Sequence, residues 1–362
     1  MNSCCFFPHS SWRIIRKRKR QNSCLAMAFN PRDSGEYIVK NAKHLTVIPE
    51  GIDILAKEVI SRLQSGELDP KNFSQNERHP KATDAYAIEW IFVVDTLNFC
   101  FWTPTDYTKY KVNGYTGYFA LCAAVNRAMA EGIDITNAAY YSTIDADTLR
   151  KIFRSDDGQT SVPLFEKRIA CLHEVGTRLL EKWQGKFENV VRAANNSAAR
   201  LLELVVSEFP CFRDEADYEG KRISLYKRAQ ILIGDIWSCF DGKELGKFND
   251  LEKITMFADY RVPQVLIHFG SMEYKPELLE VLKKDTILEN GDPREVEIRG
   301  ASIYIVEQVK DIILSKLNNK EVDVNKEHVN SILIDHFLWD YRRQHAEELE
   351  HIPFHKTLSI YY

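Results

Sequence analysis

The sequence predicts a mainly helical protein that carries a small β-sheet. Apolar residues recur at the three-to-four-residue spacing of a helix along most of the chain after Pro31. One segment, residues 89–102, is instead dense in β-branched and aromatic residues, which favour strands. No apolar run approaches the roughly 18 residues that a membrane span needs, so we expect a soluble protein.

The first predicted helix covers residues 48–64, where Ile52, Leu55 and Val59 fall on one stripe. Comparable apolar stripes occur in six later segments: residues 163–183, 198–209, 226–240, 276–284, 303–317 and 329–349. Together these segments predict a helical body that extends to the C-terminal part of the chain.

The predicted sheet combines two neighbouring segments. Residues 89–102 are interpreted as a strand or a buried extended segment, and residues 110–120 as its partner. The second segment contains Asn113 followed by Gly114, a pair that favours a tight hairpin turn. We therefore expect a small sheet appended to the helices.

A third segment, residues 294–303, alternates charged with apolar residues. Its charged residues are Glu295, Glu297 and Arg299. We interpret the segment as a surface strand whose charged pairs are solvated, because most such pairs are. A functional cluster of the three residues is the alternative.

No linker rich in Pro, Gly or Ser is long enough to separate domains. We expect residues 31–362 to form a single domain, and two lobes divided near residue 160 are the alternative that the length allows. Residues 1–30 form a basic extension without acidic residues. This extension is expected to be disordered or targeting: an organellar transit peptide, a nuclear signal or a solvated basic arm. A segment left out when synthesis starts at Met27 is a further alternative. A cytoplasmic protein is expected otherwise, and mitochondrial or nuclear targeting is the alternative.

The charge and the cysteines argue against several classes of function. A formal net charge of −4 leaves no excess of positive charge to neutralise a nucleic-acid backbone, so we expect no polynucleotide partner. The eight cysteines show no CxxC or Cys/His ligand spacing, which predicts neither a zinc site nor a disulfide framework. The chain also lacks the phosphate-loop, dinucleotide-binding, HExxH and GxSxG motifs.

The first candidate cluster lies at residues 255–270. Asp259, Tyr260 and Arg261 come just before Val262-Pro263, and a helical pattern then resumes. Proline is favoured in a first helical turn, so Asp259 is placed at or just before a helix N-terminus. It is either a helix cap or a carboxylate projecting from a fixed corner.

The second cluster pairs Lys227 with Asp235, eight residues apart on one face of a predicted helix. A lysine at the start of an apolar helix is usually exposed to solvent. A solvated Lys227 is therefore the alternative to a functional one. Asp235 lies among apolar residues and needs a partner if it is buried.

The third cluster places Asp95 and Asn98 beside Phe99, Phe101 and Trp102. Aromatic faces with a few polar groups suit a heterocyclic base, because the rings stack on it and the polar groups bond its edges. An aromatic core strand with internally bonded polar groups is the alternative.

The fourth cluster lies in the helical segment 329–349. Asp335 and Trp339 are four residues apart, so the carboxylate and the indole share one helix face. Asp340 follows directly. The segment can therefore present acidic and aromatic groups together.

Seven strings of this chain resemble the queuosine salvage family. They occur in the family's order: VVDTLNFCFW, YTGYFALCAAVNRA, LYKRAQILIGDIW, TMFADYRVPQVL, EVEIRGAS, LWDYRR and PFHKTLSIYY. The resemblance extends from about residue 31 to residue 362. It implies a helical fold like that of the helix-hairpin-helix DNA glycosylases. It also implies hydrolysis of the N-glycosidic bond of queuosine 5'-phosphate, with release of queuine for salvage into tRNA modification.

The resemblance also implies roles for residues of these strings. Asp259 corresponds to the family's catalytic aspartate and would stabilise or attack the ribose carbon, while Lys227 and Arg261 are candidates to hold the phosphate. The other implied substrate-binding residues are Asn76, Asp95, Asn98, Phe99, Trp102, Phe257, Ala258, Tyr260, Asp335, Trp339 and Asp340. His79 could replace Asn76 as the polar group ahead of the NFCFW string. No metal or organic cofactor is expected.

Two other functions are weighed beside this one. A DNA or RNA base-excision glycosylase of the same fold would need base flipping and a basic groove, and the acidic balance argues against it. A non-enzymatic queuine-binding protein would keep the pocket without turnover.

Overall fold

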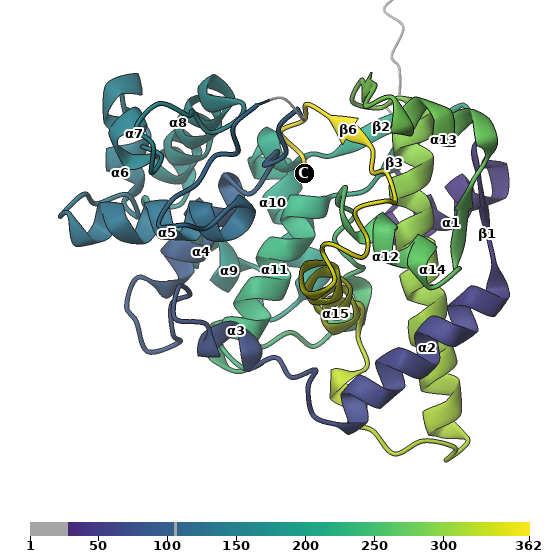
Figure 1. The fold of residues 1–362 in the computed structure, drawn as a ribbon. Coiled ribbons are helices and arrows are strands. Elements are labelled where there is room, and N and C mark those ends of the chain that lie inside the picture. The colour runs from purple at the N-terminus through teal and green to yellow at the C-terminus, as the bar shows by residue number, and fades with distance from the viewer. Residues whose placement is uncertain (1–27, 105–106) are drawn as a thin grey trace, which may run out of the picture.

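The computed structural model describes residues 28–104 and 107–362 and is mainly helical, as predicted (Figure 1). Most of the predicted basic extension lies outside these ranges. The α-helices are α1 (Pro31–Asn41), α2 (Pro49–Gln64), α3 (Asn72–Gln75), α4 (Ala87–Thr96), α5 (Gly117–Ala130), α6 (Ala138–Tyr141), α7 (Ala146–Ile152), α8 (Phe165–Lys182), α9 (Phe187–Ala193), α10 (Ala198–Glu208), α11 (Lys227–Cys239), α12 (Val262–His268), α13 (Pro276–Lys283), α14 (Pro293–Asn318) and α15 (Ser331–Gln344). Short 3-10 helices cover Pro210–Phe212, Glu244–Gly246, Leu251–Lys253 and Lys326–His328.

The strands form three separate two-stranded sheets. β1 (Leu45–Val47) pairs with β4 (Met272–Tyr274) and β2 (Glu215–Tyr218) with β3 (Lys221–Ser224), both antiparallel. β5 (Ile287–Leu288) and β6 (Lys356–Thr357) are parallel. Each sheet joins distant parts of the chain or closes a short loop, and the core is built from helices.

The sheet predicted for residues 89–120 is wrong. All ten residues of α4 are buried, and a segment that is apolar on every side has no periodicity to distinguish a helix from a strand. The turn within the second segment is confirmed, since Asn113 and Gly114 both have positive φ angles and lie between the bridged residues Val112 and Tyr115. However, α5 begins directly after this turn, and no hairpin strands form there.

The surface strand predicted for residues 294–303 is also wrong, because the segment lies inside the long helix α14. Asp292 caps this helix by accepting a hydrogen bond from the N–H of Arg294, and Pro293 occupies its first turn. Glu295, Glu297 and Arg299 are buried. Glu295 pairs with Arg299 of the same helix, but Arg299 also pairs with Asp214, and Glu297 with His44. These last two partners come from distant segments, which the sequence of α14 alone does not indicate.

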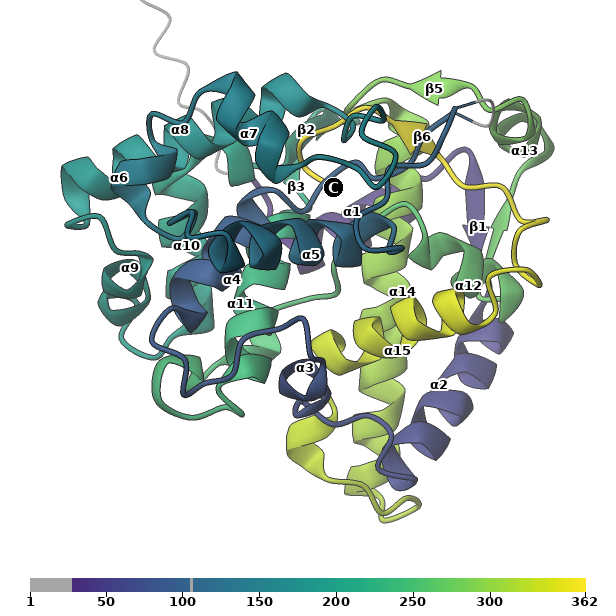
Figure 2. The ribbon, with the colours of Figure 1, turned by 60° about the vertical axis from the view of Figure 1, so that its left-hand side comes forward.

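The apolar residues form two core clusters, on either side of helix α15. One is built mainly by α4, α5 and α7–α11, and includes Ile332 and Leu333 of α15. The other is built by α1, α2 and α12–α14, and includes Ile334 and Phe337 of α15. In Figures 1 and 2, α15 lies between α11 and α14, and the N-terminal helices α1 and α2 lie beside α14. The domain boundaries, with lobes near residue 160 as the alternative, stay a prediction.

Within residues 28–104 and 107–362, no helix is long and apolar enough to cross a membrane. The same residues contain no group of His, Cys, Asp or Glu arranged to hold a metal ion. Their cysteines are all free and buried.

We expect Gly51→Ala to destabilise the protein by about 1–3 kcal/mol, the usual cost of overpacking. A Cβ atom at Gly51, in the first turn of α2, would lie 2.1 Å from the carbonyl carbon and oxygen of Gly270, which are backbone atoms and cannot rotate away. Lys57→Ala, at an exposed position of the same helix, is expected to change stability by less than about 0.5 kcal/mol. Urea unfolding of both variants tests this packing, and equal stabilities would contradict it.

Candidate active site

A cavity of about 750 Å³ lies where the two core clusters meet. Its walls come from residues 68–79, from residues 98–104 and 107–119, from α11, from residues 257–261, from α15 and from the C-terminal segment 354–362. The site is therefore assembled from segments far apart in the sequence, and α11 and α15 both contribute a face to it.

Asp259 lies in this cavity, just before helix α12. Its Oδ1 accepts hydrogen bonds of 2.8 Å from the N–H groups of Arg261 and Val262. Asp259 is not the N-cap residue of α12, which is Arg261, but its Oδ1 pairs two N–H groups of the turn that starts this helix, as a cap does. The other oxygen, Oδ2, has no hydrogen bond with any residue that the structure describes. The cap fixes the carboxylate while one of its oxygens stays free for a ligand.

Three residues of the segment before Asp259 bond to different helices. The N–H of Phe257 donates to Asp335 Oδ1 of α15 at 3.0 Å, and the carbonyl of Ala258 accepts from Arg299 Nε of α14 at 2.9 Å. The N–H of Thr255 donates to a glutamine of α11. The loop that carries Asp259 is therefore held by both core clusters.

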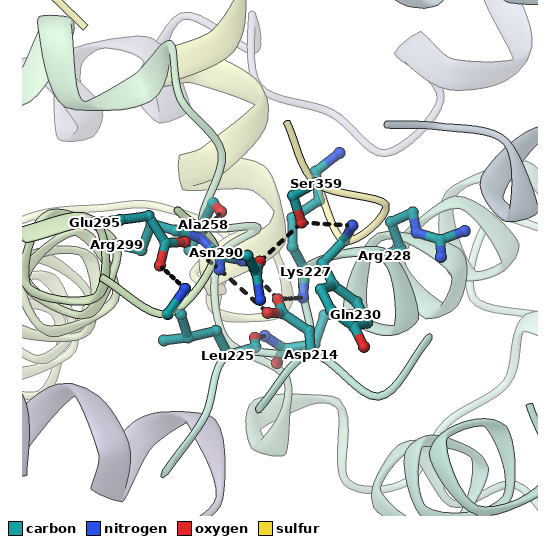
Figure 3. A network of polar contacts seen from close by, with 12 residues as sticks. Asp214, Leu225, Lys227, Arg228, Gln230, Ala258, Asn290, Glu295, Arg299 and Ser359 are labelled. Atoms are coloured by element: carbon teal, nitrogen blue, oxygen red, sulfur yellow. Dashed lines mark hydrogen bonds and ion pairs between the residues drawn. The ribbon is translucent and has the colours of Figure 1, made fainter. Parts of the chain in front are cut away.

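Arg299 is the centre of a buried polar network beneath this loop (Figure 3). Its guanidinium pairs with Asp214 at 2.5 Å and with Glu295 at 2.9 Å. Burial lowers the pKa of Arg299, but the charges of these two carboxylates outweigh it and hold the pKa above its usual value. Asp214 also accepts a hydrogen bond from the N–H of Lys227 at 3.1 Å. The network thus connects the loop before Asp259 to the first residue of α11.

Lys227 is buried at the start of α11 and faces the cavity. Its ammonium lies 3.5 Å from the carbonyl of Asn98. Burial lowers its pKa, and the nearby charges of Asp259, Asp95 and Asp335 raise it in return. Lys227 is therefore a desolvated cation whose charge interacts with the Asp259 carboxylate.

A basic side of the cavity is formed by Arg261, Arg342 and Lys356. The Oε1 of Gln264 accepts from Arg261 at 3.1 Å and from Arg342 at 2.8 Å, so the two guanidinium groups are held next to each other. Arg342 and Lys356 have carboxylate partners. Arg261 makes no ion pair within the described part of the chain and lies against the ring of Phe354, at 3.9 Å from the ring centroid.

An aromatic side of the cavity is formed by Tyr118, Phe119 and Trp339. The Trp339 ring meets those of Phe119 and Tyr118 edge-on, with centroids 5.6 Å and 6.3 Å apart. The Tyr118 hydroxyl bonds His79 Nε2 at 3.1 Å, and burial lowers the pKa of His79 to about 4. A neutral imidazole therefore lies behind these rings.

Carboxyl groups line the cavity between these sides. Burial raises the pKa of Asp335 well above its usual value, and the charge of Asp259 adds to this increase. Asp340 is exposed at the edge of the cavity. The cavity thus offers carboxyl groups together with an aromatic side and a basic side.

A comparison with protein families identifies this chain. The family model described as "Queuosine salvage protein" matches residues 78–362. The chain belongs to the queuosine salvage protein family. Its relatives in Bos taurus and Mus musculus are 46% and 45% identical over 337 residues, which cover 92% of this chain and 98% of each relative. A relative in Schizosaccharomyces pombe is 35% identical over 350 residues. All three are named queuosine 5'-phosphate N-glycosylase/hydrolase.

In this family member, most of the residues predicted for the site line the same cavity. They are Asn76, Asn98, Phe99, Trp102, Lys227, Phe257, Asp259, Tyr260, Arg261, Asp335, Trp339 and Asp340. Two predicted residues do not line it. Asp95 is buried in α4, where its Oδ1 accepts from the Asn98 amide at 3.2 Å, and Ala258 contributes its carbonyl to Arg299. Asn76 bonds Arg78 through its side-chain oxygen.

The structure adds several lining residues to those predicted. They include Tyr118, Phe119, His336, Arg342, Phe354, Lys356 and Tyr362, while Asp235 of the second candidate cluster also lines the cavity. Most of them lie inside the strings that carry the family resemblance, so a sequence signal was present. Their convergence depends on tertiary packing, since the C-terminal segment reaches α12 only in the folded chain.

Proposed function

We propose that the protein hydrolyses the N-glycosidic bond of queuosine 5'-phosphate and releases queuine for salvage into tRNA modification. The observation that carries this proposal is the free Oδ2 of Asp259, fixed in a cavity between a basic and an aromatic side. The names of the relatives supply the substrate. The arrangement of the site supports the binding of a nucleotide whose sugar lies over Asp259.

Asp259 acts on the ribose. Breaking the glycosidic bond leaves positive charge on C1', and a carboxylate beneath that carbon stabilises the charge or attacks it. The backbone N–H groups that bond Oδ1 keep the carboxylate in place during the reaction. C1' is then captured by water or by Asp259 itself, and the second case requires hydrolysis of the ester that forms.

The remaining groups bind the two ends of the substrate. Arg261 has no carboxylate partner among the described residues, and with Lys227 it would hold the phosphate. Queuine is a 7-deazaguanine with a cationic aminomethyl arm. Asp335 and Asp340 would accept from its edge and its ammonium group, and Phe257, Tyr260 and Trp339 would stack on it.

We also propose the finer features that the resemblance implies. The helices on both sides of α15 would correspond to the helix-hairpin-helix DNA glycosylase fold, within one domain of residues 31–362. The substrate would be a mononucleotide and not a polynucleotide, which fits the net charge of −4.

The proposal is tested by incubating the protein with queuosine 5'-phosphate and measuring queuine and ribose 5-phosphate. We expect both products. Queuine that binds without ribose 5-phosphate release would indicate a carrier. Tight, steeply salt-dependent binding of duplex DNA would indicate a base-excision glycosylase.

The proposed contact between Arg261 and the phosphate leads to a separate prediction. Arg261→Gln is expected to lower kcat/KM for the nucleotide about 10- to 100-fold, because a charged hydrogen bond contributes about 1.5–3 kcal/mol. The nucleoside, which lacks the phosphate, should be processed poorly by the wild type and be little affected by this change. Arg343→Gln, at the aromatic side, should leave the ratio of kcat/KM for the nucleotide to kcat/KM for the nucleoside unchanged. Equal turnover of nucleotide and nucleoside by the wild type would contradict the contact.

A further inference from the structure

Asp235 is a buried carboxyl group that faces the cavity without a protein partner. Only 5% of the residue is exposed, and it lines the cavity wall. Its oxygens make no hydrogen bond or ion pair with any residue of 28–104 or 107–362. Buried polar groups are nearly always hydrogen-bonded, because an unpaired one costs about 1–3 kcal/mol. A carboxyl in this position calls for a partner that enters the cavity.

The helix places Asp235 at the base end of the proposed substrate. Lys227, Ile231 and Asp235 are four residues apart along α11, and all three line the cavity. At about 1.5 Å per residue, the Cα atoms of the first and last lie about 12 Å apart, comparable to the length of a nucleotide. The charge of Lys227 interacts with that of Asp259. Asp235 lies about two helical turns further along the cavity wall, and its charge acts on Tyr118 of the aromatic side, where the base would stack.

The surroundings of Asp235 favour its neutral form. Burial raises its pKa well above the usual value, Asp95 raises it further, Lys227 opposes the shift, and Asp335 adds to it. The titratable groups that face it are Asp95 on α4, Tyr118 and Cys122 on α5, Lys227 and Cys239 on α11, and Asp335 on α15. Lys227 is the only cation among them. A carboxyl that holds its proton near neutral pH can donate it.

We propose that Asp235 is a further catalytic residue, the general acid that gives a proton to the departing base. This inference rests on the proposed function. When the C1'–N bond breaks, its electron pair goes to the base, which takes the Asp235 proton at a ring heteroatom and leaves as queuine with a neutral ring system. Water supplies its oxygen to the ribose and loses a proton, which restores Asp235. Asp335 is less suited to this step, because it already accepts the Phe257 N–H.

The test is Asp235→Asn, which keeps the size of the side chain and removes the acidic proton. With queuosine 5'-phosphate we expect kcat to fall about 100- to 10,000-fold, the usual contribution of a general acid, while KM changes less than about threefold. The wild type should lose kcat as the pH rises through the pKa of Asp235, and the variant should lack this decrease. Asp95→Asn should move the decrease to lower pH, because it removes a neighbouring negative charge.

Stability separates a catalytic role from a structural one. A carboxyl whose pKa is raised by folding destabilises the folded state at every pH above its pKa in the unfolded chain, so wild-type stability decreases from that pH up to the raised pKa. Asp235→Asn should therefore be at least as stable as the wild type at neutral pH, by thermal unfolding. A lowered melting temperature with a proportional loss of activity would overturn the proposal.

The outcomes distinguish this inference from the function on which it rests. Wild-type protein that releases no queuine overturns both. An active wild type together with an Asp235→Asn variant whose kcat is within threefold of it overturns only the role of Asp235. A variant that raises KM and leaves kcat unchanged would also overturn it, because such a residue only binds.

Discussion

Asp259→Asn is expected to lower kcat for queuosine 5'-phosphate about 100- to 1,000-fold, the usual cost of losing one electrostatic contact to a transition state. Asparagine is as good a helix cap as aspartate, so its side-chain oxygen can keep the hydrogen bonds to the N–H groups of Arg261 and Val262. The variant thus removes the negative charge facing the ribose and keeps the structure around it. Single-turnover measurement of queuine release checks the expected decrease.

Asp259→Ala serves as the matched comparison, because it removes both the charge and the cap. It should show a similar loss of kcat together with a loss of about 0.5–2 kcal/mol in stability. If Asp259→Asn retained kcat within tenfold of the wild type while Asp259→Ala lost it, the residue would act through the cap alone. That result would remove Asp259 from the chemistry.

Local sequence patterns predicted the positions of the helices well, but they predicted the contacts between the helices poorly. The stripe of residues 48–64 corresponds to α2, because one apolar face against one polar face specifies a surface helix. Residues 89–102 have no polar face, since α4 is buried on all sides. Their β-branched and aromatic composition favoured a strand, and tertiary packing overrode it.

Parts of the candidate site were predictable where the relative positions of the residues are set within one segment of the chain. The proline after Asp259 indicated a helix start, and the spacing of Asp335 and Trp339 indicated a shared face. The role of Arg299 was not predictable in this way, because its partner Asp214 is 85 residues away. Charged residues that alternate with apolar ones resemble a solvated strand until the folded chain brings their partners together.

Arg299→Met is expected to destabilise the protein by about 3–5 kcal/mol, the usual cost of breaking a buried ion pair from one side. The change leaves the buried carboxylates of Asp214 and Glu295 without their cation. It also removes the donor to the Ala258 carbonyl, so the loop that carries Asp259 loses one of its contacts. Chemical unfolding followed by circular dichroism measures the first effect, and kcat well below the melting temperature measures the second.

Arg294→Met is the matched control, since Arg294 lies in the same helix and pairs with Asp292 near the surface. Partly exposed pairs contribute about 0–1 kcal/mol, so this variant should stay close to the wild type. Combining Arg299→Met with Asp214→Asn and Glu295→Gln should recover part of the loss, because the unpaired charges are then absent. Equal destabilisation by the two arginine variants would contradict the argument, because a buried cation between two buried carboxylates would then contribute no more than a surface pair.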